Sequence, residues 1–218
     1  MKTLKLKRKD QNIWYTSDLH FSHKALCKGT SKWEDKSDCR DFDSIESMND
    51  TILDSINKYV KENDVLFILG DFHLGPNSEL ESLRNKINCK NIHFIFGNHD
   101  HYLKEHLEFS NKLFTTVQFY KEIKVDDLLI CLFHYKQYIW NSSHENSTSL
   151  YGHSHGDAEY IEHGKSMDVG VDNAFRILKE WRPFSHDEVM ELLKDRSFET
   201  IDHHKPHIDK LLEKKNNE

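Results

Sequence analysis

The chain has 218 residues, of which 37% are hydrophobic and 31% charged, and its formal net charge is −7. This length suits a single domain, and the 13 Phe, 8 Tyr and 4 Trp are enough to fill a core, which excludes general disorder. The negative charge argues against a protein that coats nucleic acid through bulk positive charge, although it permits a local basic groove. No apolar run reaches the ~18–20 residues that span a bilayer, and the four cysteines form no CxxC pair, so we expect a cytoplasmic protein with no membrane partner.

Short apolar runs that stop abruptly at polar residues dominate the first two thirds of the chain. Near-continuous apolar runs of this length are typical of strands that are buried on both faces, as in a sheet covered by other layers. The chain therefore predicts several interior strands whose last residues adjoin polar clusters. These strands are expected over residues 13–17, 65–69, 91–96, 128–133 and 149–151.

Helices and hairpins are predicted between and after these strands. Apolar residues at helical spacing predict helices over 42–60, capped by Asp41 or Asp43, and over 79–87. A capping box, Ser185-His-Asp-Glu188, predicts a later helix. The predicted hairpins join 117–124 to 128–133 and turn near 162–165 before a strand over 167–171. No repeat or linker divides the chain, so we expect one domain over 1–195 and a charged tail or short helix over 196–218.

Polar residues follow each of the five predicted strands, and several of them could bind metal. A lone Asp-x-His is usually an ordinary turn, but so many titratable groups crowded at strand ends would be costly without a metal to neutralise them. Imidazole with carboxylate oxygen suits a first-row divalent metal, and there are too many ligands for one ion. Residues i and i+2 of an extended segment point the same way, so Asp18 with His20, and His153 with His155, can each face one cavity. Glycines before Asp71, Asn98 and His153 suit a tight turn and close backbone approach.

In chain order the motifs are Asp18-Leu-His20, Gly70-Asp71, Gly97-Asn-His-Asp100, His134 and Gly152-His-Ser-His155. This set resembles the signature of the calcineurin-like metallophosphoesterase superfamily, and the resemblance runs from about residue 13 to residue 171. It implies an α/β fold, a four-layer αββα sandwich with two mixed β-sheets. Four shorter motifs are also similar to those of a small single-domain subgroup found in bacteria and their phages. They are Ser17-Asp-Leu-His-Phe-Ser-His23, Gly70-Asp-Phe72, Phe133-His-Tyr135 and Val169-Gly-Val-Asp172.

The resemblance also implies a centre of two divalent metal ions. The ligands of the first ion would be Asp18, His20, Asp71 and His155, and those of the second Asp71, Asn98, His134 and His153. Asp71 would bridge the two ions. His99 matches the histidine of the family that acts on the substrate, and Asp100 would orient it. The mixture of nitrogen and oxygen ligands favours Mn2+, with Fe2+, Zn2+ and Ni2+ as alternatives.

Two departures separate the chain from better-known branches of the superfamily. Asp71 is followed by Phe-His-Leu-Gly75, which lacks the arginine of the Ser/Thr protein phosphatases. Leu74 stands where purple acid phosphatases have a metal-binding tyrosine, which argues against an iron–tyrosinate centre.

Four further residues are candidates for contact with the substrate. His23 could reach the phosphate or cap a following helix, and His73 could lie at the edge of the site. Arg40 and Asn49 could bind phosphate near the mouth, or could simply be solvated residues. Asp172 could hydrogen-bond one of the ligating histidines.

We therefore expect a metal-dependent phosphohydrolase in which a hydroxide activated by two metals attacks phosphorus. Phosphodiesters are favoured over monoesters as substrates, including nucleotide-derived and cyclic diesters and short nucleic-acid ends. One alternative is a non-catalytic scaffold of the same fold, but such a protein would be expected to lose ligands or the acting histidine. Another is a metal-buffering protein, which only the 16 histidines suggest.

Overall fold

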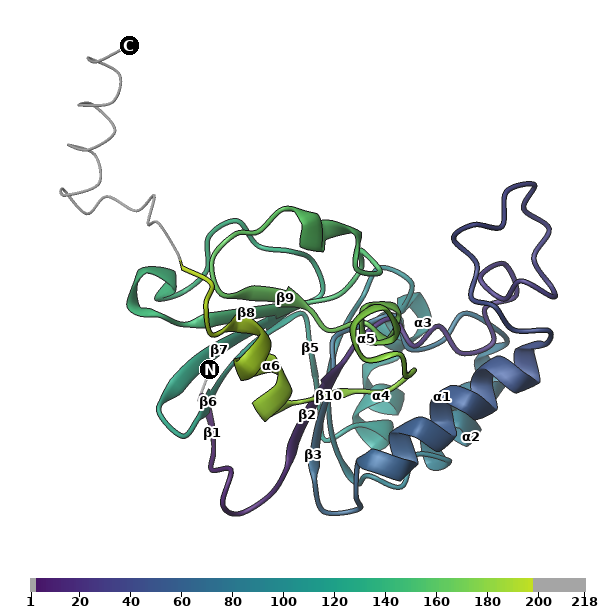
Figure 1. The fold of residues 1–218 in the computed structure, drawn as a ribbon. Coiled ribbons are helices and arrows are strands. Elements are labelled where there is room, and N and C mark those ends of the chain that lie inside the picture. Colours follow the sequence, from purple (N-terminus) through teal and green to yellow (C-terminus); the bar gives the residue numbers. More distant parts are fainter. Residues whose placement is uncertain (1–2, 198–218) are drawn as a thin grey trace, which may run out of the picture.

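Two five-stranded sheets form the frame of the protein, and this computed structural model describes residues 3–197 (Figure 1). The first sheet has the strand order β10-β2-β3-β4-β5 and the second β1-β6-β7-β8-β9. Both are mixed, because β10 runs antiparallel to β2 and β6 antiparallel to β7 while the other pairs are parallel. The strands are β1 (Leu4–Leu6), β2 (Ile13–Thr16), β3 (Val65–Ile68), β4 (Asn91–Ile95), β5 (Thr116–Gln118), β6 (Tyr120–Val125), β7 (Leu128–Phe133), β8 (Thr148–Tyr151), β9 (Ser166–Asp168) and β10 (Phe184–Ser185).

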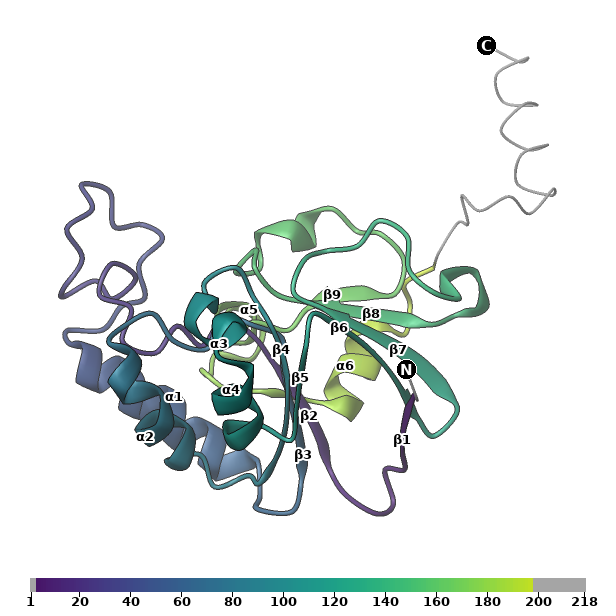
Figure 2. The same cartoon turned by 180° about the vertical axis from the view of Figure 1, so that it is seen from behind.

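Helices cover the outer face of the first sheet, and loops cover that of the second (Figures 1 and 2). Helices α1 to α4 pack on the first sheet, while α5 and α6 follow β9 and β10 at the edge of the molecule. The second sheet is covered by loops with short 3-10 turns, which hold its outward side chains: Tyr151 donates to Glu159, and Cys131 contacts Asn141. The elements are α1 (Ile45–Tyr59), η1 (Asn77–Glu79), α2 (Leu80–Asn85), α3 (His101–Glu105), α4 (Leu107–Leu113), η2 (Ser143–Glu145), η3 (Asp157–Tyr160), α5 (Val171–Leu178) and α6 (His186–Leu193).

The predicted α/β fold with two mixed sheets is thus confirmed, although the fourth layer of the sandwich is built from loops. The middle strands are buried on both faces, as predicted. In β3, Leu66 and Ile68 face the helices, whereas Phe67 and the following Leu69 face the second sheet. The core between the sheets includes residues from Leu6 to Leu193, so both ends of the described chain contribute to it.

Several local predictions need correction. The N-cap of α1 is Ser44, whose hydroxyl accepts from the Ser47 N–H, and not Asp41 or Asp43. The predicted strand over 117–124 is interrupted at Phe119, where the chain passes from the first sheet into the second. The turn near 162–165 does not form a hairpin, because β9 runs parallel to β8 after a crossover loop, and the chain enters α5 at Val171. The tail predicted from residue 196 lies beyond the described residues except for its first two positions.

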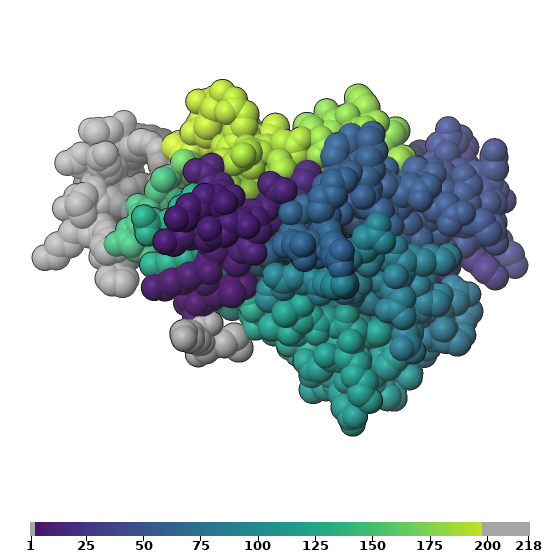
Figure 3. Space-filling model, turned by 90° about the horizontal axis from the view of Figure 1, so that it is seen from below, coloured from purple at the N-terminus to yellow at the C-terminus, as the bar shows by residue number. Residues whose placement is uncertain are grey.

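Two other features of the fold agree with simple physical expectations. The capping box is present, with Ser185 and Glu188 each bonded to the backbone of the other. On the face opposite the carboxyl ends of β2 and β3, the N-terminal segment lies beside α6 (Figure 3), where Arg8 donates to Asp187.

No helix among residues 3–197 combines the length and the apolar character needed to cross a bilayer.

A buried histidine in β4 makes the stability of the fold depend on pH. The His93 ring stacks on Phe67 at a centroid distance of 5.0 Å, and its Nδ1 shares a 2.8 Å hydrogen bond with the Thr116 hydroxyl. Burial lowers the pKa of His93 to about 4, from an ordinary value of 6.5. The neutral ring therefore stabilises the fold fully above about pH 6.5, and this contribution is lost as the pH falls toward 4.

We predict that His93→Gln, measured in metal-free protein, weakens this pH dependence. Between pH 7 and pH 4 the parent protein should lose about 2–3 kcal/mol more of its free energy of unfolding than the variant does, since one pKa unit corresponds to about 1.4 kcal/mol. Urea unfolding at a series of pH values measures the difference. His101→Gln, at an exposed position, should follow the parent; parallel curves for His93→Gln and the parent would contradict the prediction.

Candidate metal centre and active site

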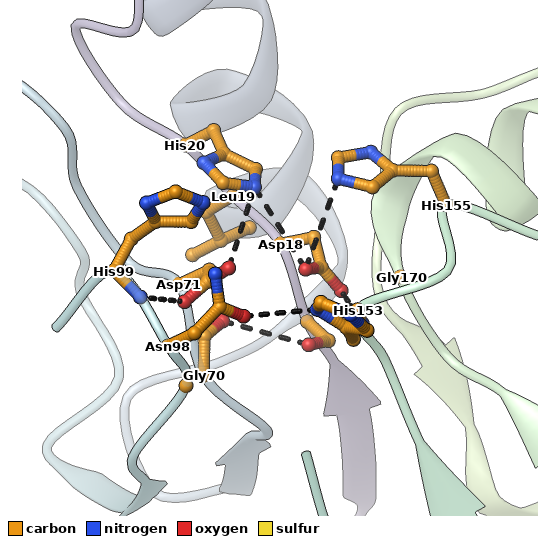
Figure 4. Close-up of polar contacts among 12 residues, drawn as sticks. Asp18, Leu19, His20, Gly70, Asp71, Asn98, His99, His153, His155 and Gly170 are labelled. Carbon is orange, nitrogen blue, oxygen red and sulfur yellow. Dashed lines mark hydrogen bonds and ion pairs between the residues drawn. The ribbon is translucent and has the colours of Figure 1, made fainter. Parts of the chain in front are cut away.

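The carboxyl ends of five strands from both sheets meet at one place (Figure 4). The first sheet contributes the residues that follow β2, β3 and β4, and the second those that follow β7 and β8. All seven predicted metal ligands are brought together there, in two groups. They are Asp18, His20, Asp71, Asn98, His134, His153 and His155.

The first group consists of Asp18, His20 and His155. The His20 Nε2 lies 3.8 Å from Asp18 Oδ1, and the His155 Nε2 lies 4.0 Å from the same oxygen. Asp71 Oδ2 lies 3.7 Å from the His20 Nε2, so this carboxylate also faces the first group.

The second group is formed around the amide oxygen of Asn98. This oxygen lies 2.9 Å from His134 Nε2 and 2.9 Å from His153 Nδ1. The His134 Nε2 is 3.5 Å from Asp71 Oδ2. A single oxygen of Asp71 therefore faces both groups, as the bridging position implied by the resemblance requires.

These residues fit divalent metal ions. Ligand bonds of about 2.0–2.2 Å place neighbouring ligand atoms of one ion about 3–3.5 Å apart, and the atoms of each group are within about 1 Å of that spacing. The Oδ1 atom of Asp18 is fully buried and has no hydrogen-bond partner in the described structure. A buried carboxylate oxygen without a partner is costly, and a cation beside it would remove that cost.

Five of the seven ligands have a left-handed backbone. The pairs Asp18 with His20 and His153 with His155 are therefore not extended, and the alternation of an extended segment does not explain their common direction. Asp18 and His20 have φ of 55° and 49°, Asp71 has 53°, and His153 and His155 have 67° and 50°. Such conformations cost of order 1–3 kcal/mol each and persist only where the surroundings hold them. Here the loops hold one another, since Asp18 N–H donates to the Gly70 carbonyl and His20 N–H to the Asp71 carbonyl.

The predicted close approach is confirmed at all three glycines. A Cβ on Gly70 would lie 2.5 Å from His134 Nδ1. A Cβ on Gly152 would lie 2.0 Å from the Ser17 hydroxyl and 2.4 Å from Asp18 Oδ2. A Cβ on Gly97 would lie 2.2 Å from Asp71 Oδ1. Any larger residue at these positions would displace a predicted ligand.

Comparison with known proteins agrees with this geometry. The sequence model described as calcineurin-like phosphoesterase matches residues 11–217. The chain belongs to this family. Membership supports metal-dependent hydrolysis of a phosphate ester, and it confirms the resemblance stated from the motifs.

Two individual proteins are similar to this phosphoesterase. The uncharacterized protein MJ1445 of Methanocaldococcus jannaschii is 33% identical over 92 residues, which are 41% of this chain and 47% of that protein. The match thus spans about half the length of the relative. The crystal structure of the protein of unknown function AQ665 from Aquifex aeolicus superposes with a TM-score of 0.59 at 22% identity, over 84% of this chain and 99% of that one. At this identity the similarity concerns the fold alone.

Asp100 occupies a different position from the one predicted. Its carboxylate is 3% exposed and accepts hydrogen bonds from the backbone N–H groups of Asp71, Phe72 and Gly97, at 2.8, 3.1 and 2.6 Å. No hydrogen bond joins this carboxylate to the His99 ring in the described structure. Burial raises the pKa of Asp100 to about 7. Asp100 therefore orders the turn that carries Asp71.

Arg40 is also placed differently, because it is buried and does not reach the mouth of the site. Its guanidinium donates to both oxygens of Asp172, at 2.9 and 2.8 Å, and to the carbonyls of Asp18 and Leu19. Asp172 in turn accepts from His155 Nδ1 at 2.6 Å, the bond proposed from the sequence. Burial would raise the pKa of Asp172, but Arg40 and His155 hold it below its usual range. The pKa of His155, which burial would lower, is raised to about 9 by Asp172.

The other three substrate-contact candidates lie around the same loops. The His23 ring is 5.1 Å from the His20 ring and 6.4 Å from the His99 ring, at the edge of the centre. Asn49 accepts from the Ser22 N–H at 2.9 Å and donates to its hydroxyl, so it supports the loop that carries His20. His73 is 6% exposed, with its Nε2 3.6 Å from a carboxylate oxygen of Glu79.

One residue that supports the site was missed in the sequence. Asp168, at the end of β9, is fully buried and accepts from the Ser154 hydroxyl and from the N–H groups of Gly156 and Gly170. It thereby holds the loop of His153 and His155 against the start of α5. The signal was an aspartate at the end of an apolar segment, the same pattern that identified the ligands after the other strands.

The pKa values of the two carboxylates nearest the centre are shifted in opposite directions. Burial raises the pKa of Asp18 to about 7. Burial would also raise the pKa of Asp71, but the hydrogen bond and charge of His134, together with His20, lower it to about 2. At neutral pH, Asp71 is thus an ionised carboxylate at the junction of the two groups.

We predict that Arg40→Lys weakens metal binding, because lysine cannot reproduce the two-pronged contact with Asp172 that orients His155. Replacing a residue that helps to orient a metal ligand typically lowers metal affinity about 10–100-fold, and we expect a loss in this range for Arg40→Lys. Competition titration with a chromophoric chelator measures the affinity.

Arg176→Lys is the matched control, since Arg176 is exposed on α5 and bonds only Asn173 among the described side chains. If Arg40→Lys bound metal as tightly as the parent does, the Arg40–Asp172 ion pair would not be needed to position the ligands.

Proposed function

We propose that this protein is a dinuclear metal-dependent phosphodiesterase. The observation that carries the proposal is the position of Asp71 Oδ2, 3.7 Å from His20 Nε2 in one ligand group and 3.5 Å from His134 Nε2 in the other. A carboxylate placed in this way offsets the repulsion between two dications. The carboxylate and amide oxygens among the ligands favour Mn2+ over softer metals.

The chemistry divides between the ions and the side chains of the chain. Two bound divalent ions would supply an activated water and stabilise negative charge on the phosphate oxygens. Asp71 and Asp18 would hold the ions, and Asp100 orders the Asp71 loop through its backbone N–H groups. His99 belongs to neither ligand group, yet its ring is 5.5 Å from that of His20 and its N–H donates to Asp71 Oδ1. We assign to His99 the transfer of a proton to the leaving oxygen.

The charges around the centre favour a diester over a monoester. Arg40 is buried and its guanidinium pairs with Asp172, so it does not reach the mouth of the site. We assign the phosphate contacts to the imidazoles of His23 and His99. A monoester carries close to two negative charges at neutral pH and a diester only one, so the diester needs fewer cationic side chains. The free cysteines are in keeping with the cytoplasmic setting that we propose.

The central test is the metal content of reconstituted protein. We expect two ions per chain by elemental analysis, and the highest activity with Mn2+ when Mn2+, Fe2+, Zn2+ and Ni2+ are compared. Asp71→Asn should lose metal from both groups, because one oxygen serves both. Asp127→Asn, at the exposed β6–β7 turn, should keep both ions.

Saturation at one ion per chain would overturn the dinuclear proposal. The loaded protein should also hydrolyse bis(p-nitrophenyl) phosphate with a higher kcat/KM than p-nitrophenyl phosphate. The reverse order would assign the protein to the monoesterases.

We further predict that His99→Ala keeps both ions while kcat falls about 10²–10⁴-fold, the usual contribution of a positioned general acid. The loss should grow with the pKa of the leaving alcohol, because a nitrophenolate leaves without a proton and an alkoxide does not. Diesters with a graded series of leaving groups provide the measurement. His144→Ala, exposed on η2, is the control. Equal losses across the series would mean that His99 stabilises charge, and loss of an ion would make it a ligand.

A further inference from the structure

A pocket of about 310 Å3 lies beside His99, between the segment that leads into η1 and helix α3. His99 lines this pocket while its ring also faces His20. In the close-up, His99 lies on one side of the centre and His155 on the other (Figure 4). The pocket therefore extends the site on the side of the proposed general acid.

The walls of the pocket suit a flat and mostly apolar group. Leu80 and Leu103 are 3% and 2% exposed and form an apolar floor, and Leu74 and Tyr102 also line it. Polar side chains stand at the exposed rim. Small-molecule sites combine such an apolar lining with a few polar groups, within about 300–1,000 Å3. The volume here is at the lower end, and fits a single ring system with its sugar. The rim residues are Asn77, His101 and Glu105.

The charge of the lining excludes a strongly anionic occupant. None of the described lining residues is a lysine or an arginine, whereas Glu105 stands at the rim. Asp100 also lines the pocket and is buried. The next phosphate of a polynucleotide would meet no lysine or arginine here, and His99 is already engaged with the leaving oxygen, although nucleic-acid sites depend on cationic contacts. An uncharged group therefore fits better than a continuing strand.

We propose that this pocket binds the leaving group of the substrate and that this group is an uncharged nucleoside. The proposal rests on the proposed function, in which His99 protonates the leaving oxygen. Water attacks phosphorus, the bond from phosphorus to the nucleoside oxygen breaks, and that oxygen takes the proton from His99. The products are a nucleoside and a phosphomonoester. The preferred substrates are thus small diesters with a nucleoside on one side, in preference to long nucleic acids.

Cleavage of the methyl ester of adenosine 5′-phosphate tests the orientation. The two alcohols are similar as leaving groups, so the products report which one occupies the side of His99. We expect adenosine and methyl phosphate as the main products of the Mn2+-loaded protein. Methanol and adenosine 5′-phosphate as the main products would overturn the proposal.

Binding of adenosine to the metal-free protein tests the pocket without catalysis. Equilibrium dialysis should show saturable binding that Leu74→Trp weakens at least about 10-fold, because the larger ring fills the pocket. Leu107→Trp, a matched change at a 51% exposed position on α4, should bind as the parent does. Asn77→Trp is a second pocket-filling variant that should also weaken adenosine binding, and its position at the exposed rim leaves the core unaltered.

No saturable binding by the parent, or equal binding by all variants, would overturn the pocket assignment. A protein that binds adenosine in this manner but hydrolyses no phosphate ester would instead contradict the proposed function. The two failures are therefore distinguishable.

Discussion

The organisation of this phosphoesterase depends on the Asp71 carboxylate. One of its oxygens faces the histidines of two ligand groups, and the other accepts the His99 N–H at 2.8 Å. This places the proposed acid at a fixed distance from the junction of the two groups. Because Asp71 sits in a left-handed turn, its position has to be imposed from outside. Asp100 does so through three backbone hydrogen bonds, and Gly97 makes room for the carboxylate.

Other buried charged groups around the centre also hold loops of unfavourable conformation, as Asp100 holds the Asp71 turn. Arg40 and Asp172 fix the loop of Asp18 and the ring of His155, and Asp168 fixes the loop after β8. Breaking one partner of such a buried pair leaves the other charge uncompensated, which is far more costly than the pair is stabilising. These residues therefore specify geometry, and the stability of the fold rests mainly on its apolar core.

The centre also couples the two sheets. One ligand group combines residues after β2 with His155 from after β8, so neither sheet holds it alone. The sheets approach closely at this point: Ser17 bridges to Gly170, and Gly152 is packed against Ser17 and Asp18. Metal ligation thus depends on the packing of the core between the sheets, and rigid strands position a site that is itself built from loops.

The sequence by itself determined the buried strands and the residues gathered at the strand ends, because apolar runs and the polar motifs after them are local patterns. The resemblance of these motifs to a known family implied the α/β class. The sequence also determined the capping box of α6. Only the tertiary structure decided that β8 and β9 are parallel, that Arg40 turns inward to Asp172, and that Asp100 serves a backbone turn. Strand pairing and the partner of a charged side chain depend on residues distant in sequence, such as the 132 positions between Arg40 and Asp172, which no local pattern records. The left-handed conformation of the ligand loops was also decided by the tertiary structure, because its strain is balanced only by contacts made after the two sheets have packed.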